Sequence, residues 1–263
     1  MPKVKEIASL IEDFAPKALQ EDYDNTGLQV GDPEMEVSAA LICLDVTEEV
    51  MAEARQRGCN MVISHHPLLF KGLKQITGAS PEQRIVAEAI RSSIAIYAAH
   101  TNLDSVAYGV SHEMADAIGL QDIRPLLPAE GFKDAGMGVI GETPDPVPAM
   151  EFLRRLKEIF QVKCLRYSRT TTKLVVKRVA LCGGSGSSLI PEALRQGADA
   201  YVTGDLRYHD FTSYGPEILL ADVGHYEGEL CSTKIFSRLI HEKFPNFVTY
   251  YAQSGKNPVG FIC

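Results

Sequence analysis

Several kinds of segment are missing from this chain of 263 residues, and each absence excludes a class of protein. No apolar run approaches the roughly 18 residues that a membrane-spanning helix needs. The N-terminal segment 1–17 is charged throughout, so it lacks the apolar stretch and the cleavage site of a signal peptide. It predicts an amphipathic helix instead. We therefore expect a cytoplasmic protein with no membrane partner.

Cysteine is scarce and scattered as well. The six cysteines form no CxxC pair, which favours buried thiols in a reducing compartment over a disulfide framework or a cysteine-based zinc site. The hydrophobic share of 45% and the charged share of 23% are ordinary values that exclude a disordered or fibrous chain. The length allows one large domain or two modest ones.

Positive charge is in deficit, except in one segment. The net charge is −8, so the chain as a whole is a poor partner for nucleic acid. Residues 151–180, however, carry nine Lys and Arg against two Glu. This segment is either a solvated helix face followed by a strand, or a patch that binds a phosphorylated ligand or a nucleic acid. Nucleic acid is therefore an unfavoured but still open partner.

Strands alternate with helices along the chain. Apolar, β-rich segments predict strands at 38–45, 60–64, 94–98, 174–182, 200–203 and 218–222. Capping residues and apolar periodicity predict helices at 48–57, 81–92, 109–118, 148–160, 189–196 and 226–243. This alternation predicts an α/β protein with largely parallel sheets. We expect a first domain at 1–128, completed by 235–263, and a second at 129–234.

The two halves contain an internal echo. Residues 53–66 align without gaps to residues 192–205, with matching Glu, Ala and Gly before an apolar strand. Residues 98–104 echo residues 223–229, each with a histidine followed four residues later by a carboxylate. The halves are either a true duplication or two βαβ units with a general likeness. A duplication would give pseudo-repeated domains whose polar ends face each other, with a metal site in the cleft between them.

The motif Ser64-His65-His66-Pro67 follows a short apolar strand. In open parallel sheets, ligands bind beyond the carboxyl ends of the strands. Adjacent histidines on an extended backbone point to opposite sides, so His65 and His66 could serve two metal ions, or one ion if the chain turns. The alternative is a pair of ordinary loop histidines.

A second group, His100-Thr-Asn-Leu-Asp104, also follows a predicted strand. The carboxylate of Asp104 is a hard anionic ligand for a divalent ion. The alternative is that Asp104 caps the helix that comes after it.

The third group is His225-Tyr-Glu-Gly-Glu229. If the chain is helical from His225, the spacing places His225 and Glu229 on one face, where they form half of a divalent-metal site. Glu229 has two oxygens and could bridge two ions. The alternative is a surface helix whose first turn carries Glu because the helix dipole favours it, a description that fits Glu227.

Together the three strand ends supply five nitrogen and oxygen ligands and no thiolate. This set suits zinc, iron, manganese or magnesium. With one bridging carboxylate, it is about right for two divalent ions roughly 3.5–4 Å apart. The predicted metal ligands are His65, His66, Asp104, His225 and Glu229. By contrast, His112 falls in a predicted helix and is expected to be an ordinary surface or core residue.

A glycine-rich turn, Cys182-Gly-Gly-Ser-Gly-Ser-Ser188, joins a predicted strand to a predicted helix. Its backbone N–H groups could cradle an anion. It has neither the lysine of a Walker A loop nor the spacing of a dinucleotide fingerprint. The alternative is a tight turn with a serine cap.

Five motifs carry a resemblance to a known family. They are SHHPLLF at 64–70, HTNLD at 100–104, GGSG at 183–186, TGD at 203–205 and GHYEGE at 224–229. In this order they resemble the type 2 GTP cyclohydrolase I homologues, also called NIF-three-like or dinuclear-metal-centre proteins. The loop at 23–31 resembles the family's N-terminal loop, with Tyr23 where a Trp is usual. Segment 126–173 is too short for the extra middle domain of longer members, so the chain looks like the compact form.

This resemblance implies two α/β domains per chain, a toroidal homohexamer, and a dinuclear site with two divalent metal ions. The residues that match the family's site are the five predicted ligands. The favoured hypothesis is therefore a dinuclear-metal-dependent hydrolase of the GTP cyclohydrolase type, in which metal-activated water attacks the purine ring of a nucleotide. A nucleotide or another phosphorylated small molecule is then the expected partner.

Two further expectations concern catalysis and its absence. His100 stands beside the ligand set and is the candidate catalytic residue, acting as a proton carrier or as a group that orients a ligand. The alternative function is a non-catalytic metal-binding or regulatory ring protein, which is associated with nucleic acid if residues 151–180 bind it.

Overall fold

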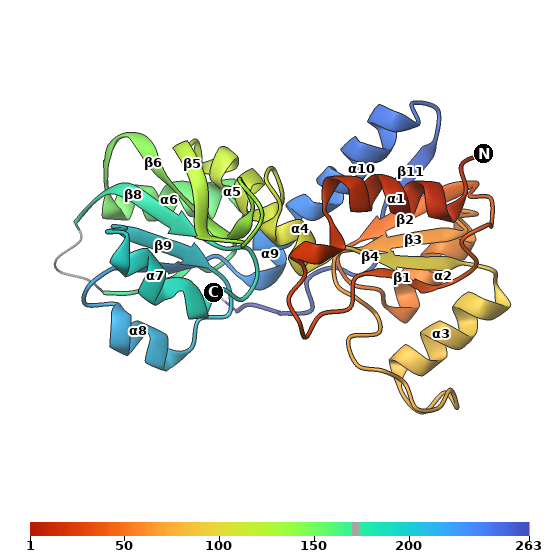
Figure 1. The fold of residues 1–263 in the computed structure, drawn as a ribbon. Coiled ribbons are helices and arrows are strands. Elements are labelled where there is room, and N and C mark those ends of the chain that lie inside the picture. The colour runs from red at the N-terminus through yellow and green to blue at the C-terminus, as the bar shows by residue number, and fades with distance from the viewer. Residues whose placement is uncertain (170–173, 263) are drawn as a thin grey trace. The chain divides into compact units, whose positions relative to one another are not determined.

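The computed structural model describes residues 1–169 and 174–262 and divides the chain into two compact units (Figure 1). The first unit comprises Met1–Leu103 and Ser232–Pro258, and the second comprises Asp104–Cys231 with residues 259–262. The chain leaves the first unit within α4 (Thr101–Ser105) and returns to it within α10 (Cys231–Lys243).

The boundaries between the two units therefore fall after residues 103 and 231, whereas the sequence led us to expect domain boundaries after residues 128 and 234. Residues 104–128 lie with the second unit because they include α5 and β5, which contact β6. The last cysteine, Cys263, lies outside the described residues.

The first unit is built on a five-stranded sheet with the order β1-β4-β3-β2-β11. Four neighbouring strands are parallel, and only β1 runs antiparallel, next to β4. Its strands are β1 Gly27–Val30, β2 Ala39–Cys43, β3 Met61–Ser64, β4 Ala95–Ala98 and β11 Val248–Tyr251. Its helices, besides α4 and α10, are α1 Val4–Phe14, the 3-10 helix η1 Lys17–Leu19, α2 Glu48–Gln56 and α3 Pro81–Arg91.

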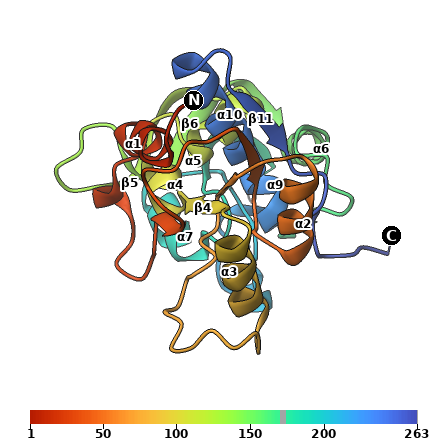
Figure 2. The same ribbon diagram turned by 90° about the vertical axis from the view of Figure 1, so that its right-hand side faces the viewer.

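Helices cover both faces of this sheet. Figure 1 shows α1 and α10 on one side and α2 and α3 on the other, and Figure 2 shows α1 and α10 on the opposite side of β4 from α3. Leu41, Val62 and Ile96 belong to the apolar core against α2 and α3. On the other face, the hydroxyl of Tyr97 reaches Glu12 of α1 at 3.4 Å. Because both faces are buried, the strands are continuous apolar runs, which is why the sequence reveals them.

The register of the parallel strands determines where the polar residues emerge. The last residues of three neighbouring strands pair with one another: Cys43, Ser64 and Ala98. The three strands therefore end at one level. The segments that follow them carry Asp45, the pair His65–His66, and His100, and all leave the sheet at that edge.

The second unit has a six-stranded sheet with the order β5-β6-β8-β9-β10-β7. Its strands are β5 Gln121–Pro128, β6 Gly136–Pro148, β7 Arg166–Tyr167, β8 Val175–Leu181, β9 Ala200–Thr203 and β10 Leu219–Asp222. Its helices are α5 Val110–Ile118, α6 Ala149–Ile159, the 3-10 helix η2 Ser187–Leu189, α7 Ile190–Arg195, α8 Tyr208–Tyr214 and α9 His225–Glu229. A buried apolar cluster that includes Ile140, Tyr201 and Leu220 packs against α7.

This second sheet is mixed, and the two sheets with their alternating helices confirm the predicted α/β class. Only β8, β9 and β10 are parallel, whereas β5 pairs with β6, β6 with β8, and β7 with β10 in antiparallel fashion. The sequence missed β5 and β6 because prolines interrupt both, and proline normally argues against a central strand. In β6 the register slips between Glu142 and Val147, and Pro144 and Pro146 lie within that irregular stretch.

The parallel part of this sheet, like the sheet of the first unit, brings polar residues together where its strands end. Strands β8, β9 and β10 end near a common level, since Leu181 pairs with Val202 and Thr203 pairs with Asp222. The glycine-rich turn, Asp205 and His225 follow these three strands. The single helix expected over 226–243 is two helices, α9 and α10, and the first begins at His225 itself.

No helix among the residues that the structure describes is both long and apolar enough to cross a membrane.

The carboxylate of Glu53 fastens the C-terminal segment to α2. It accepts hydrogen bonds from the Ser254 amide at 2.8 Å, the Gln253 amide at 2.9 Å and the Arg57 guanidinium at 2.8 Å. Burial opposes ionisation, but the hydrogen bond from the Ser254 hydroxyl at 2.5 Å, together with the three above, outweighs it and holds the pKa of Glu53 at about 2. A depressed pKa in the folded state means that the stabilisation is complete above the ordinary carboxyl pKa and is lost as the pH falls toward 2.

We predict that Glu53→Gln lowers the free energy of unfolding by about 1–3 kcal/mol at pH 7. The gap to the wild type should narrow between about pH 4.5 and pH 2, because protonation then removes the same charge from the wild type. Denaturant unfolding over this pH range measures both effects. Glu242→Gln, at an exposed position of α10, is the control and should unfold like the wild type. A gap that stays constant with pH would contradict the assigned role of the Glu53 charge.

Candidate metal centre

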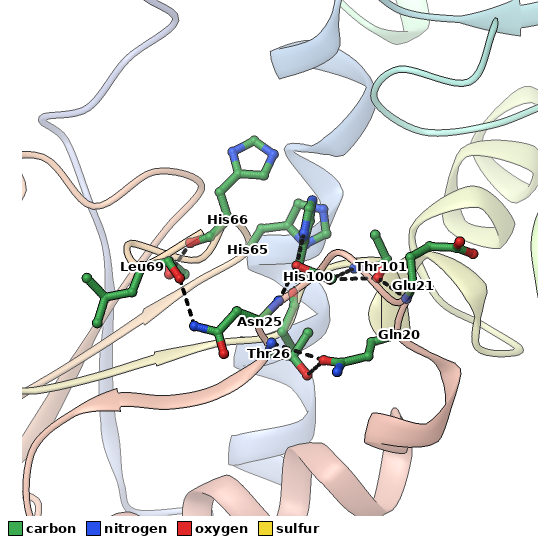
Figure 3. A network of polar contacts seen from close by, with 12 residues as sticks. Gln20, Glu21, Asn25, Thr26, His65, His66, Leu69, His100 and Thr101 are labelled. Atoms are coloured by element: carbon green, nitrogen blue, oxygen red, sulfur yellow. Dashed lines mark hydrogen bonds and ion pairs between the residues drawn. The ribbon is translucent and has the colours of Figure 1, made fainter. Parts of the chain in front are cut away.

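Three histidines of the first unit gather at the edge where β3 and β4 end (Figure 3). The ring centroids of His65 and His66 are 5.2 Å apart, and the ring of His100 lies 5.2 Å from the first and 5.3 Å from the second. One ring nitrogen from each histidine lies within 4.8 Å of the other two. This histidine cluster can therefore supply nitrogen ligands to a metal ion.

Hydrogen bonds orient the rings of His65 and His66. The Nδ1 atom of His65 lies 2.9 Å from the carbonyl oxygen of Ala99, and that of His66 lies 2.7 Å from a carboxylate oxygen of Asp45. Because these oxygens accept, the neutral rings carry the proton on Nδ1 and the lone pair on Nε2. Metal-binding histidines in proteins are commonly fixed in this way, which makes Nε2 the ligand atom of both.

His100 is held by a carboxylate that the sequence did not single out. One oxygen of Asp24 lies 2.9 Å from Nδ1 of His100, and the other accepts from the Thr101 hydroxyl at 2.6 Å and the Thr101 amide at 3.1 Å. Burial alone would raise the pKa of Asp24, but the hydrogen bonds from His100 and Thr101 outweigh burial and lower it to about 2. Asp24 is thus charged at neutral pH and favours a proton on Nδ1 of His100.

The loop that carries Asp24 is itself anchored. The side-chain carbonyl of Gln20 accepts from the amide of Thr26 at 3.1 Å and from its hydroxyl at 2.8 Å. The side-chain amide of Asn25 donates to the carbonyl oxygen of Leu69 at 2.7 Å (Figure 3). These bonds fix the loop on both sides of Asp24, and they connect it to the segment that follows the histidine pair.

In the second unit, α9 presents His225 and Glu229 on one face, as the spacing predicts. Nε2 of His225 lies 2.9 Å from Glu229, and Nδ1 lies 2.8 Å from Asp205. The hydrogen bond that His225 donates to Glu229 raises the pKa of His225 to about 9, against burial and with help from Asp205. Without a metal, His225 and Glu229 are therefore an ion pair at neutral pH, and a cation that binds here replaces the proton.

Asp104 completes the acidic side of this second cluster. A carboxylate oxygen of Asp104 lies within 4.8 Å of one of Glu229. The two residues are only 8% and 3% exposed. Two buried carboxylates at this separation repel each other and are poorly solvated, so the pair favours a cation. The buried acidic pair is the observation in this unit that fits a divalent metal.

Gly184 of the glycine-rich turn packs directly against the carboxylate of Glu229. A Cβ atom on Gly184 would lie 1.9 Å from a carboxylate oxygen of Glu229 and 3.3 Å from Nε2 of His225, and the residue has a φ of +60°. Only glycine allows this approach. The amides of Gly183 and Gly186 donate to side-chain hydroxyls of this unit, at 3.3 Å and 2.9 Å. The close approach to Glu229, rather than an anion cradle, explains the glycine at 184.

Asp222, at the end of β10, positions the chain around this second cluster. Its carboxylate accepts from the amide of Leu206 at 3.0 Å and from that of Gly224 at 3.0 Å, and it is ion-paired with Arg166. Leu206 follows Asp205 in the chain, and Gly224 precedes His225. A single buried carboxylate therefore fixes both partners of the Asp205–His225 contact.

The donor sets of the two clusters match a divalent ion with nitrogen and oxygen preference. The first unit offers imidazole nitrogens whose orientation is fixed, and the second offers an imidazole and two carboxylates. Such sets suit zinc, iron or manganese, and magnesium where carboxylates predominate. The residues present thus fit the metals that the sequence predicts.

The structure places all five predicted ligands in these clusters, and their role as ligands stays a prediction. His65 and His66 lie in the first, and Asp104, His225 and Glu229 lie in the second. His100, expected as a proton carrier, lies as close to the paired histidines as they do to each other. The sequence did not identify the carboxylates that orient the histidines: Asp24, Asp45 and Asp205. Asp45 ends the strand predicted at 38–45 and Asp205 comes just after the one predicted at 200–203, which was the available signal, whereas Asp24 lies in a loop.

The basic segment 151–180 is partly neutralised by neighbouring carboxylates. Ion pairs join Arg155 to Glu151, Arg166 to Asp222, and both Lys177 and Arg178 to Glu142. Another of its basic residues, Lys173, lies outside the described residues. Binding of a phosphorylated ligand or a nucleic acid by this segment stays a prediction.

Comparison with known proteins gives a consistent result. The sequence model of the Duf34/NIF3 (NGG1p interacting factor 3) family matches residues 2–258. A GTP cyclohydrolase 1 type 2 homolog from Clostridium acetobutylicum is 36% identical over 98% of both chains. One from Lactococcus lactis is 35% identical over 97% of this chain and 98% of its own.

Solved structures with the same fold extend the comparison. A Bacillus cereus protein related to NIF3 is 28% identical, with a TM-score of 0.85 over 99% of both chains. A hypothetical protein from Staphylococcus aureus is 27% identical, with a TM-score of 0.89 over 99% of both chains. The likeness thus spans both units of the chain.

We predict that Gly184→Ala weakens metal binding by about 10–100-fold or more, because the new methyl group displaces the carboxylate of Glu229. Metal titration monitored by calorimetry measures this loss. Gly131→Ala is the matched control, since Gly131 has a φ of +80° but no atom within 4 Å of its added Cβ. Both variants carry the strain of a positive φ, and only the first adds the clash. Equal metal affinity in the two variants would contradict the role given to Gly184.

Proposed function

Because the chain belongs to the Duf34/NIF3 family, we propose that its two clusters together form the dinuclear metal centre of a hydrolase. The observation that carries this proposal is the orientation of the histidines. Each of the three histidines among the predicted ligands, His65, His66 and His225, has its Nδ1 atom within hydrogen-bonding distance of a carbonyl or carboxylate oxygen, which leaves Nε2 as the ligand atom. A chain that used these histidines only on its surface would gain little from fixing every ring.

The five predicted ligands would hold the two ions together. His65, His66 and His225 would bind through Nε2, and Asp104 and Glu229 through carboxylate oxygens, with Glu229 as the ligand that both ions could share. Bound divalent ions lower the pKa of water toward neutrality and so supply a nucleophile for hydrolysis. The protein contributes fixed imidazoles and a buried carboxylate whose place is secured by Gly184.

His100 has a separate part in this proposal. It holds or moves a proton at Nε2, while the ionised carboxylate of Asp24 accepts from Nδ1 and so fixes the tautomer and the orientation of the ring. A carboxylate behind a histidine is a common arrangement for a general acid or base, because it selects the tautomer and stabilises the positive charge. Asp24 is therefore a positioning residue, and His100 is the proposed proton carrier.

The substrate class rests on the names of the relatives. Several are called GTP cyclohydrolase 1 type 2 homologs, which supports a nucleotide with a purine ring as the substrate. The toroidal homohexamer stays part of the proposal on the resemblance alone. Metal loading followed by a turnover screen against nucleotides, with a chelated control, tests the hydrolase directly. Metal uptake without turnover would instead support the non-catalytic metal-binding protein.

We predict two divalent ions per chain in protein purified without chelator and soaked in metal. Glu229→Gln keeps the shape of the side chain but removes the charge that offsets the cations, so it should lower this ratio. Glu227→Gln, on the same short helix, should keep the wild-type ratio. Elemental analysis measures all three proteins. Fewer than one metal ion per chain in the wild type would contradict the dinuclear centre. Equal metal content in the two variants would show that Glu229 is not a ligand.

His100→Ala should leave the metal content unchanged and lower the rate of hydrolysis by ~10²-fold or more, the scale of a lost general acid or base. His209→Ala, at an exposed helix position, is the control and should keep both the metal content and the rate. Loss of one ion per chain in the His100 variant would make His100 a metal ligand instead. Full activity with full metal content would show that it carries no proton in the reaction.

A further inference from the structure

A pocket of the second unit has the features of a site for a flat, charged ligand. Its volume is about 310 Å³, at the lower end of the range for small-molecule sites. The loop between α4 and α5, strand β5 and the start of β6 line it. Asp104, one of the predicted metal ligands, contributes to the same wall. The pocket therefore adjoins the acidic side of the second cluster.

An aromatic platform forms one part of this pocket. Tyr108 is 62% exposed and has a φ of +61°, a backbone conformation that a bulky residue rarely adopts. Its ring centroid lies 4.7 Å from that of His112, whose Nδ1 atom is 3.2 Å from Asp116. A strained backbone that holds a large ring out in a pocket is a feature typical of ligand sites.

Charged and apolar groups complete the lining. Arg124 reaches the pocket from β5, where the register with β6 slips between Gln121 and Arg124. Such bulges redirect a side chain next to a site. The first partner of the nearby carboxylate of Glu192 is Arg195, and Arg124 interacts with that carboxylate more weakly. Among the described residues that line the pocket, Arg124 carries the positive charge that an anion needs.

We propose that this pocket binds a planar heteroaromatic ring that carries an anionic group, as a nucleotide does. The ring stacks on Tyr108 and His112, and Arg124 binds the anion. Asp134, also in the lining, accepts from N–H groups at the edge of the ring. This inference deepens the proposed function, because it names the pocket and the residues that would bind the purine nucleotide of that proposal. It rests on that function only through Asp104.

Calorimetric titration with guanosine 5′-monophosphate, guanosine and ribose 5-phosphate separates the ring from the anion. The full chain is used, both loaded with metal and treated with chelator. Tyr108→Leu should weaken binding of the nucleotide about tenfold or more, the scale of one lost base–aromatic stack. Tyr108→Phe should bind like the wild type, since it keeps the ring. Arg124→Gln should weaken binding of the nucleotide but not of guanosine.

Tyr208→Leu is the matched control. Tyr208 is 74% exposed and its ring lies 5.4 Å from that of His209, so it reproduces an exposed tyrosine beside a histidine outside the pocket. It should leave nucleotide binding unchanged. Equal weakening by Tyr108→Leu and Tyr208→Leu would overturn the proposal. So would wild-type binding by the Tyr108 variant, or a change only in its self-association by light scattering.

Metal content separates this inference from the proposed function. If the protein takes up two ions per chain but binds no nucleotide at millimolar concentration, the pocket assignment is wrong and the metal centre stands. If it binds nucleotide through Tyr108 but takes up no metal, the metal centre is wrong and the pocket assignment stands.

Discussion

Parallel pairing of short, buried strands is the constraint on which both clusters depend. Strands β2, β3 and β4 run in one direction and end at one level, so the residues that follow them emerge together. Strands β8, β9 and β10 do the same in the second unit. Each core keeps its apolar residues within the strands and leaves the first polar residue of each loop at the edge. A metal cluster needs just such a convergence of side chains from distant parts of the chain.

Carboxylates that accept hydrogen bonds from the histidines fix the orientation of the rings within these clusters. Asp45, Asp24 and Asp205 each hold the Nδ1 atom of one histidine at 2.7–2.9 Å. They select the tautomer, restrict the ring and add negative charge close to the place where cations are proposed to bind. The depressed pKa of Asp24 and the raised pKa of His225 have the same origin, a hydrogen bond between a carboxylate and an imidazole.

Close backbone packing and backbone hydrogen bonds determine where the remaining side chains of the second cluster lie. Gly184 leaves room for the carboxylate of Glu229, and no larger residue could occupy its position without moving that carboxylate. Asp222 ties together the chain before His225 and the chain after Asp205. Local backbone irregularities also position side chains beside Asp104. The positive φ of Tyr108 and the irregular register before Arg124 occur at two residues that line the same pocket.

The sequence by itself determined the class of the fold and the strands and helices with buried faces. It also predicted five ligands whose side chains the structure places in the two clusters. It could do so because a strand buried on both faces is a continuous apolar run, and because His65, Asp104 and His225 stand just beyond such runs. It missed β5 and β6, since prolines at an irregular register look like loop residues. Only the tertiary structure decided which oxygen orients each histidine. That choice depends on residues far apart in the chain: Asp24 lies 76 positions before His100, and no local pattern connects them.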